Sequence, residues 1–377
     1  MTRQDIEAAS DPAPSARAVR SVVVVSPGGT VGGGGTGSVS REIQQWLVIN
    51  RQDIDVAVLD PRGVGSAFLW PLYLARALVQ LIGLRLGGAD LLHIQVTERS
   101  SFIRKGIALH VGRLLGMRTM LHHHGASLDV DFAGYSRLAR RWLIGTARAA
   151  HLNVALGERG KQFLMRDVGV PEDRIVILPN AINDVGGEER PARVAGQTIH
   201  YLLMANLSPR KGVSEFLQAM RRLKDEGRAV HATLAGGEEV ARYQKEAVDL
   251  GMERECTFTG WVKRDRVAEL LRDADVLVLP SYHEVLPMVI LEALSARIPV
   301  ITTPVGSIPE VLTNERDCLL VQPGSVDELA VAMRRVADDE ALYRQLADNG
   351  RALYEERFEM SAYMTRLLAI YERVLNE

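Results

Sequence analysis

Short apolar runs alternate with longer amphipathic segments along most of the chain. Ser21–Ser26, Leu91–Ile94 and Val276–Leu279 are rich in β-branched residues or leucine and show little polar alternation. Runs of this kind are typical of parallel strands that are buried on both faces. The segments between them carry apolar residues at helical spacing. The pattern therefore predicts an α/β fold in which helices cover both faces of parallel sheets.

The first half of the chain holds a series of predicted strands and the helices that connect them. A helix follows the first strand, and further helices are expected at residues 66–86 and 100–115. A shorter helix opens at Gly157–Lys161. The strands are expected at residues 21–26, 54–59, 91–94, 119–121, 152–155 and 175–178.

A polar segment rich in Gly and Pro, residues 183–197, interrupts the alternation and predicts a connector between two domains. Beyond it, strands are expected at residues 200–204, 232–237, 257–262, 276–279, 296–302 and 319–321. One helix begins near Pro287, and three more are expected at about 326–338, 341–356 and 359–376.

A chain of 377 residues is long enough for two domains, each with its own core. The first twenty residues are polar and rich in Ala, Pro and Ser, without the apolar core of a signal peptide, so we expect a disordered leader. The predicted leader, first domain, linker, second domain and final helix comprise residues 1–20, 21–182, 183–197, 198–356 and 357–377.

Charge is distributed unevenly between the two halves. The net charge of −2 argues against nucleic acid as the main partner. Residues 1–187 carry 21 Lys or Arg and 16 Asp or Glu, whereas the remainder carries 24 and 31. A basic first half predicts that this half faces something anionic. Cys256 and Cys318 lack metal-ligand spacing and are expected to be buried thiols in a reducing compartment.

Residues 68–86 come closest to a membrane-spanning segment. Arg76 and Arg85 interrupt this apolar run, so a largely buried or interfacial helix is expected instead. Scattered basic residues follow it. They are Arg99, Arg104, Lys105, Arg113, Arg118, Arg137, Arg140, Arg141 and Arg148. Such a series is usually a solvated face, yet beside an apolar helix it could attract an anionic bilayer or a diphosphate-bearing lipid. Both interpretations stay open.

The first strand runs into a glycine-rich loop, Pro27–Gly37, and then into a helix. This arrangement lets the backbone approach a ligand closely and offer N–H groups to an oxyanion. A dinucleotide-binding oxidoreductase is an alternative, since glycine-rich turns also bind pyrophosphates and Asp60 could bind a ribose. The loop is longer and richer in glycine than that fingerprint.

Three consecutive histidines, His122, His123 and His124, follow the strand at 119–121. Adjacent residues of a strand point to opposite faces, so at most two converge, and no acidic residue has zincin-like spacing. A metal site is therefore not expected. The structural alternative is that each histidine is simply hydrogen-bonded in the core. Asp129 is a potential polar partner.

Two segments of the second half could hold a phosphate group. Arg210 and Lys211 lie between a strand end and a helix start, where the helix dipole and both side chains can converge on a diphosphate. Glu284 lies in the turn after the strand at 276–279, and Glu292 lies on the second turn of the following helix. Ligands of open parallel sheets bind at the carboxyl ends of strands, where first-turn N–H groups can hold an anion. Each of these four residues could instead be an ordinary surface charge.

The Glu284 and Glu292 pair resembles the signature of family 4 glycosyltransferases, which are retaining and use nucleotide sugars. The flanking segments Ala274–Ser281, Ala296–Thr302 and Ile308–Val311 resemble the same family. The resemblance is strongest over residues 198–335 and looser over the first half. It implies two Rossmann-like domains that face a cleft, an arrangement called GT-B, with the final helix returning to the first domain.

The resemblance also implies roles for particular residues. Glu284 would bind a donor-sugar hydroxyl and Glu292 the ribose, while Arg210 and Lys211 would hold the diphosphate. The histidine before glycine, His124, would contact the donor sugar and the acceptor hydroxyl, with His123 as second choice. The remaining donor-binding residues implied are Gly34, Gly35, Gly260, Trp261, Val262, Leu286, Pro287, Met288 and Val289.

The function implied is transfer of a hexose-type sugar from a UDP- or GDP-linked donor to a hydroxyl of a saccharide or lipid-linked acceptor. The expected setting is bacterial cell-surface polysaccharide or glycolipid assembly, in the cytoplasm and at the inner face of the membrane. Neither a metal nor another cofactor is expected. The family commonly has glycine after the first glutamate, where this chain has Val285, so the identity of the sugar stays open. A catalytically silent GT-B binding protein is a further alternative.

Overall fold

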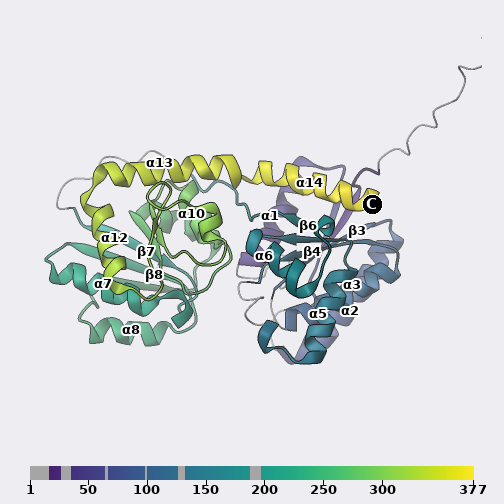
Figure 1. Ribbon diagram of the computed structural model, residues 1–377, viewed down its shortest axis with the longest axis horizontal. Coiled ribbons are helices and arrows are strands. Elements are labelled where there is room, and N and C mark those ends of the chain that lie inside the picture. Colours follow the sequence, from purple (N-terminus) through teal and green to yellow (C-terminus); the bar gives the residue numbers. More distant parts are fainter. Residues whose placement is uncertain (1–16, 27–34, 64–66, 98–99, 126–131, 187–196) are drawn as a thin grey trace, which may run out of the picture.

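Two parallel six-stranded sheets, one in each half of the chain, form the framework of the molecule (Figure 1). The computed structural model describes residues 17–377 apart from 27–34, 64–66, 98–99, 126–131 and 187–196. The predicted α/β class and the GT-B arrangement are confirmed. Helices pack on both faces of each sheet, because the strands expose apolar side chains on both faces.

The first sheet has the strand order β2-β1-β3-β4-β5-β6. Its strands are β1 (Ser21–Val25), β2 (Asp55–Leu59), β3 (Leu91–Val96), β4 (Arg118–His123), β5 (Leu152–Ala155) and β6 (Ile175–Ile177). Its helices are α1 (Gly35–Asn50), α2 (Trp70–Leu86), α3 (Ser100–Leu114), α5 (Arg137–Ala149) and α6 (Glu158–Phe163). Short helical segments at Ala67–Leu69, Leu164–Val168 and Glu172–Arg174 complete this half.

The second sheet has the strand order β12-β11-β10-β7-β8-β9. Its strands are β7 (Ile199–Met204), β8 (Val230–Ala235), β9 (Cys256–Gly260), β10 (Val276–Leu279), β11 (Val300–Thr302) and β12 (Leu319–Leu320). The surrounding helices are α7 (Val213–Asp225), α8 (Val240–Asp249), α9 (Val267–Asp273), α10 (Met288–Ser295), α11 (Ile308–Val311), α12 (Val326–Asp338) and α13 (Glu340–Arg357). Single 3₁₀ turns lie at η4 (Pro209–Lys211) and η5 (Arg264–Arg266).

The last helix, α14 (Met360–Asn376), crosses from the second half back to the first (Figure 1). The Ile182 N–H donates to the Phe358 carbonyl at 3.1 Å, so the two crossings of the chain lie side by side. Glu359 caps α14 by accepting a hydrogen bond from the Ala362 N–H. One face of α14, including Tyr363 and Leu367, is buried against the strands of the first sheet. The predicted return of the final helix is confirmed.

Strand order decides where a ligand can bind. In the second sheet, β7 lies between β8 and β10, so the connections leaving β7 and β10 run in opposite directions across the sheet. A crevice forms at the carboxyl ends of such a strand pair, which is the topological switch point of a doubly wound sheet. The sequence places Arg210 and Lys211 after β7 and Glu284 after β10. The topology therefore brings these distant segments together.

Candidate functional site

Glycine lets the turn after β7 lie directly against the end of β10. Gly212 has a φ of +68°, and a Cβ there would lie 2.2 Å from the Pro280 carbonyl oxygen. Only a residue without a side chain fits so close to a backbone oxygen in this conformation. The Tyr282 N–H also donates to the Arg210 carbonyl at 2.8 Å. These contacts hold η4 and the 280–287 loop in one fixed arrangement.

Glu284 lies in a basic environment at this junction. Its carboxylate is buried, with a relative exposure of 7%, and it is ion-paired with the Lys211 ammonium. Arg210 Nη1 lies 3.9 Å from the other carboxylate oxygen and donates to the His283 carbonyl at 2.7 Å. The structure thus brings three of the predicted site residues into one cluster. Because two cations face one carboxylate, the cluster has positive charge available for an anionic ligand.

The backbone of Glu284 is fixed by the segment after β11. Gly306 has a φ of +59°, and a Cβ there would lie 1.9 Å from the Glu284 carbonyl oxygen. The Ser307 N–H donates to the Val285 carbonyl at 2.9 Å. Glycine is therefore required at position 306, both by the left-handed backbone conformation and by the close contact with the Glu284 carbonyl. Gly306 was not among the predicted site residues, although its place in a Pro-Val-Gly-Ser turn was a signal.

Glu292 lies on the second turn of α10, as predicted, and is partly buried. Burial raises the pKa of its carboxyl group, and the nearby Arg264 guanidinium partly opposes that shift. Arg264 also forms an ion pair with Glu42, a buried residue of α1 in the first half. Glu42 in turn accepts a hydrogen bond from the Asn183 N–H at 3.1 Å. Arg264 thus links the two halves beside Glu292, a role that the sequence analysis missed.

Helix α10 begins directly after the loop that carries Glu284. Pro287 is extended, with φ −65° and ψ 130°, and the helix begins at Met288. First-turn N–H groups, such as those of Met288 and Val289, have no partner within a helix and can bind an anion. Leu286 is buried in the apolar core, so only its backbone faces the turn.

The predicted base-binding segment lies at the end of β9. Gly260 has a φ of +67° and accepts a hydrogen bond from the Gly236 N–H at 2.9 Å. The Trp261 ring is 59% exposed and lies over the neighbouring turn, since a Cβ on Gly237 would be 3.6 Å from it. Val262 packs partly against the core. An exposed indole beside a glycine turn leaves a face on which a planar base can stack.

In the first half, His123 rather than His124 lines the pocket between the two sheets. His123 ends β4 and is hydrogen-bonded through Nε2 to Asn153 Oδ1 at 2.9 Å. Burial lowers the pKa of His123 to about 4, so its imidazole is neutral at pH 7. The His124 ring lies tilted against that of His122, with ring centroids 4.2 Å apart, and burial lowers the pKa of His124 to about 3. His122 and His124 share one face at the end of β4, as strand alternation requires. His122 also contacts His93 of β3, with 3.3 Å between ring nitrogens.

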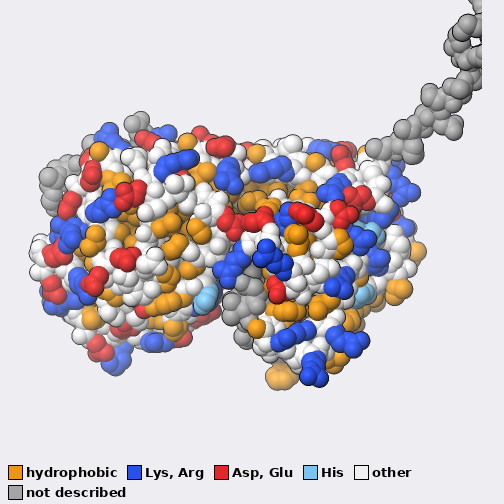
Figure 2. All heavy atoms as spheres, viewed as in Figure 1, with side chains coloured by type: hydrophobic (Ala, Val, Ile, Leu, Met, Phe, Trp, Pro, Cys, Tyr) orange, Lys and Arg blue, Asp and Glu red, His pale blue; other side chains and the backbone are white. Residues whose placement is uncertain are grey.

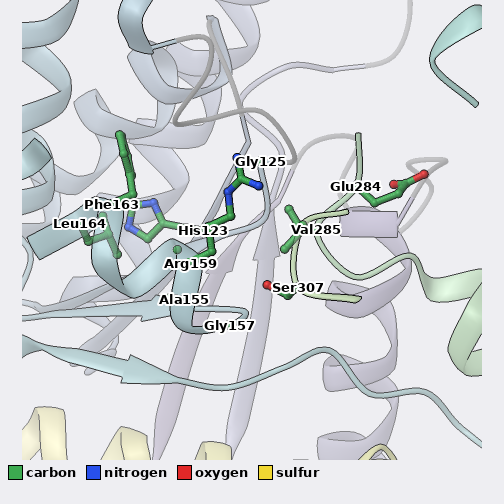
Figure 3. Close-up of a pocket in the computed structure, with 12 residues that line it drawn as sticks. His123, Gly125, Ala155, Gly157, Arg159, Phe163, Leu164, Glu284, Val285 and Ser307 are labelled. Atoms are coloured by element: carbon green, nitrogen blue, oxygen red, sulfur yellow. The ribbon is translucent and has the colours of Figure 1, made fainter. Parts of the chain in front are cut away.

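The pocket itself is formed by both halves and encloses about 510 Å³, including the part open to solvent (Figure 3). Val285 and Ser307 of the second half face Arg159 and Gly125 of the first. The lining residues are His123, Gly125, Ala155, Gly157, Arg159, Gly160, Phe163, Leu164, Glu284, Val285, Gly306 and Ser307.

Among the predicted site residues that the structure describes, Glu284 and the second-choice His123 line this pocket, and the others are not part of its lining. Gly34 and Asp129 lie outside the described residues, and Gly35 is the first residue of α1. Within the described part of the chain, no group of three His, Cys, Asp or Glu side chains is arranged to hold a metal ion. No helix among the described residues combines the length and apolar content needed to cross a bilayer.

Comparison with known proteins identifies the family. The family model for Glycosyltransferase Family 4 matches residues 17–185, and the one for Glycosyl transferases group 1 matches residues 188–353. Together they span both sheets and the pocket between them. The chain belongs to glycosyltransferase family 4. It is therefore a glycosyltransferase, and an oxidoreductase that uses the glycine-rich loop has no support.

Two curated relatives illustrate the similarity. The 2-deoxystreptamine glucosyltransferase of Streptomyces kanamyceticus is 28% identical over 371 residues, covering 92% of this chain and 94% of that enzyme. The UDP-Gal:alpha-D-GlcNAc-diphosphoundecaprenol alpha-1,3-galactosyltransferase of Escherichia coli is 25% identical, covering 61% of this chain and 63% of that enzyme.

Solved structures confirm the fold of this glycosyltransferase. The sucrose-phosphate synthase of Thermosynechococcus elongatus superposes with a TM-score of 0.76 at 18% identity, covering 94% of this chain and 99% of that one. HepE of Anabaena, in complex with UDP and glucose, superposes with a TM-score of 0.73 at 17% identity, covering 94% and 100%. At these identities the likeness concerns the fold alone.

Proposed function

We propose that this glycosyltransferase transfers a hexose-type sugar, with retention of anomeric configuration, from a nucleotide diphosphate sugar to an acceptor hydroxyl. The observation that carries the proposal is the convergence of Arg210, Lys211 and Glu284 at the switch point of the second sheet. An anion bound there meets two cations and the free N–H groups at the start of α10. Diphosphate is the anionic group of an activated sugar that suits this combination.

In this proposal each charged or anion-binding group has a separate task. Arg210, Lys211 and the N–H groups of Met288 and Val289 hold the diphosphate. Glu292 accepts hydrogen bonds from the ribose hydroxyls, and Glu284 binds a hydroxyl of the donor sugar. Trp261 stacks on the base, which we propose to be the uracil or guanine of a UDP- or GDP-linked donor.

The reaction proceeds on one face of the sugar. The bond between the anomeric carbon and the diphosphate oxygen breaks, and its electron pair leaves with the phosphate. The acceptor oxygen forms its bond to the same face of the anomeric carbon, and its proton passes to the departing phosphate oxygen. Positive charge held at the leaving group stabilises the charge that develops there, which is commonly the largest single contribution to catalysis. The scheme uses neither a metal nor another cofactor.

The acceptor side of the proposal rests on the pocket of Figure 3. His123 lines it and is held by Asn153, so its neutral imidazole can contact the donor sugar and the acceptor hydroxyl. His124, which precedes Gly125, is the alternative for the same role. We propose a saccharide or lipid-linked acceptor in bacterial cell-surface polysaccharide or glycolipid assembly, reached from the cytoplasm at the inner face of the membrane. The Escherichia coli relative is named for an alpha-D-GlcNAc-diphosphoundecaprenol acceptor, which favours a lipid-linked form.

A thermal-shift panel of UDP-, GDP- and ADP-linked sugars tests the proposal first. One donor is expected to raise the melting temperature, and NMR of the transferred sugar is then expected to give the donor's own anomeric configuration. Glu292→Ala should weaken donor binding, and Arg210→Ala or Lys211→Ala should lower turnover. Full activity of all three variants would refute the assignment. Donor binding without transfer or hydrolysis would instead favour a catalytically silent binding protein.

A further inference from the structure

Helix α2 exposes an apolar stripe on the side that faces away from the sheet. The helix already buries Leu74, Ala77 and Leu81 against the core of the first half. On its outer side, Leu72 is 68% exposed, Val79 69% and Leu86 85%. These three residues recur at seven-residue spacing and so share one face of the helix. A surface helix of a globular protein normally carries polar residues on this side.

The charged residues of the three helices in this region all have one sign. Helices α2, α3 and α5 contain nine Lys or Arg residues and no Asp or Glu. Arg76 lies within the stripe, and Arg137 and Arg141 lie on the outer side of α5. All three are exposed, and no described residue forms an ion pair with any of them. They therefore remain available for an external anion.

The three helices are neighbours in space. In Figure 1, α2, α3 and α5 lie together on the lower side of the first half, and α3 packs against both of the others. Figure 2 shows hydrophobic and Lys or Arg side chains side by side over that region. We define the outward side chains of α2 and α5 as the α2–α5 face, with Leu72, Arg76, Val79, Arg137 and Arg141 as its test positions.

We propose that the α2–α5 face binds the surface of an anionic lipid bilayer, with the α2 stripe entering the acyl boundary and the arginines meeting the headgroups. This inference deepens the proposed function, on which it rests for the lipid-linked acceptor. A helix with an apolar face and flanking arginines lies in the plane of the membrane–water interface, where its apolar face contacts acyl chains and its arginines contact headgroups. Each arginine near an anionic surface adds to the attraction.

A second copy of this chain is a less suitable occupant. A symmetric dimer through this face would set Arg76, Arg137 and Arg141 of one copy against the same arginines of the other, without acidic residues on these helices to pair with them. An anionic bilayer supplies the missing negative charge and accepts the apolar stripe at the same time.

Flotation with unilamellar vesicles tests the proposal on the full chain without donor or acceptor. The wild type is expected to float with vesicles of phosphatidylcholine and phosphatidylglycerol and to remain largely unbound with phosphatidylcholine alone. Leu72→Gln/Val79→Gln is expected to lower the partition coefficient about tenfold or more, because two inserted side chains lose their apolar contact. Arg137→Gln/Arg141→Gln should lower the partition coefficient about fivefold for each charge removed. Raising the salt concentration should also lower the partition coefficient of the wild type.

Matched controls lie on α8 of the second half. Val248→Gln removes an exposed apolar side chain and Lys245→Gln an exposed charge, and both should leave flotation unchanged. Donor-induced thermal shift, measured on every variant without vesicles, reports folding and the proposed function separately. Equal partitioning of wild type and Leu72→Gln/Val79→Gln would overturn the inference. A dimer in sedimentation equilibrium that this double variant dissolves would also overturn it, in favour of a contact between copies.

Discussion

The carboxylate of Glu310 lies 2.6 Å from the backbone nitrogen of Glu158 and accepts its hydrogen bond, joining the second half of the chain to the first. It accepts another from the Arg159 N–H at 3.1 Å. The residue before α6, Gly157, has no side chain with which to cap that helix. A Cβ on Gly157 would lie 2.3 Å from Ser307 Oγ, so glycine is needed for the contact. The cap of α6 is thus supplied across the pocket by the opposite half.

Glu310→Ala should loosen the contact between the halves. Loss of a cap costs about 1 kcal/mol of helix stability, and here the helix end and the closed arrangement depend on each other. We expect a larger radius of gyration by small-angle X-ray scattering and a lower kcat/KM with the donor found by the panel. Glu315→Ala is the control, since Glu315 pairs with Arg335 within the second half. Unchanged values for both measurements would contradict a role in closure.

Lys211→Met should remove the charge that the leaving diphosphate meets most closely. A preorganised group of this kind is worth about 100-fold or more in kcat when removed, so kcat/KM should fall by that order. Steady-state kinetics of Lys245→Met serve as the control, because Lys245 is an exposed residue of α8 paired with Asp249. A fall of similar size in the control, or none in Lys211→Met, would exclude the assigned role.

Gly306→Ala should displace the loop that carries Glu284. The new Cβ would both overlap the Glu284 carbonyl and require a left-handed backbone, at a cost of about 1–3 kcal/mol. Urea denaturation should show that loss, and the donor-induced thermal shift should shrink. Gly145→Ala, in α5 with no atom within 4 Å of the added Cβ, should show neither effect. Normal donor binding in the Gly306 variant would mean that the loop tolerates the shift.

Val285→Gly should widen the wall of the pocket. Val285 lines it opposite Arg159, so its side chain limits the space beside the donor sugar. Differences of a methylene or two in a pocket change selectivity by about tenfold or more. We therefore expect the ratio of kcat/KM between two donor sugars to change by that order, with the nucleotide preference unchanged. If the ratios of kcat/KM across a panel of hexose donors do not change, the donor sugar does not bind beside Val285.

Acid should destabilise the protein through its buried histidines. Burial lowers the pKa of His93 to about 3 from an ordinary 6.5, so the unfolded chain binds a proton that the folded chain does not. The contribution of His93 to the free energy of unfolding is complete above pH 6.5 and is lost progressively as the pH falls toward 3. Between pH 6.5 and 5 this amounts to about 2 kcal/mol for one histidine.

His93→Gln removes one of these protonation sites. Urea denaturation at pH 7 and pH 5 should show a loss of unfolding free energy that is about 2 kcal/mol smaller in the variant than in the wild type. The variant is expected to be less stable at pH 7, because it loses the hydrogen bond to the Tyr371 hydroxyl. The comparison still holds, because it uses the change in unfolding free energy between the two pH values within each protein. Equal pH dependence of both proteins would show that His93 is protonated in the folded state.

The local sequence pattern predicted the strands and most of the helices. It also predicted that candidate site residues follow the ends of strands. The runs at Ser21–Val25 and Val276–Leu279 are buried strands because no other element suits so short and continuous an apolar segment. Glu284 in a turn and Glu292 on the second turn of a helix followed from spacing alone. The family resemblance added the GT-B arrangement and the return of α14.

The local sequence pattern could not predict contacts between segments that are distant in the chain. Local sequence was enough to predict which residues end each strand, because burial and backbone preference act within a few positions. The folded arrangement was needed to show that His123 lines the pocket and that the outer side of α2 is uncovered. It was also needed to show that Arg264 pairs with Glu42 and that Glu310 caps α6. Each of these depends on which element lies opposite, and that is set by strand order and by how the two halves of the chain face each other.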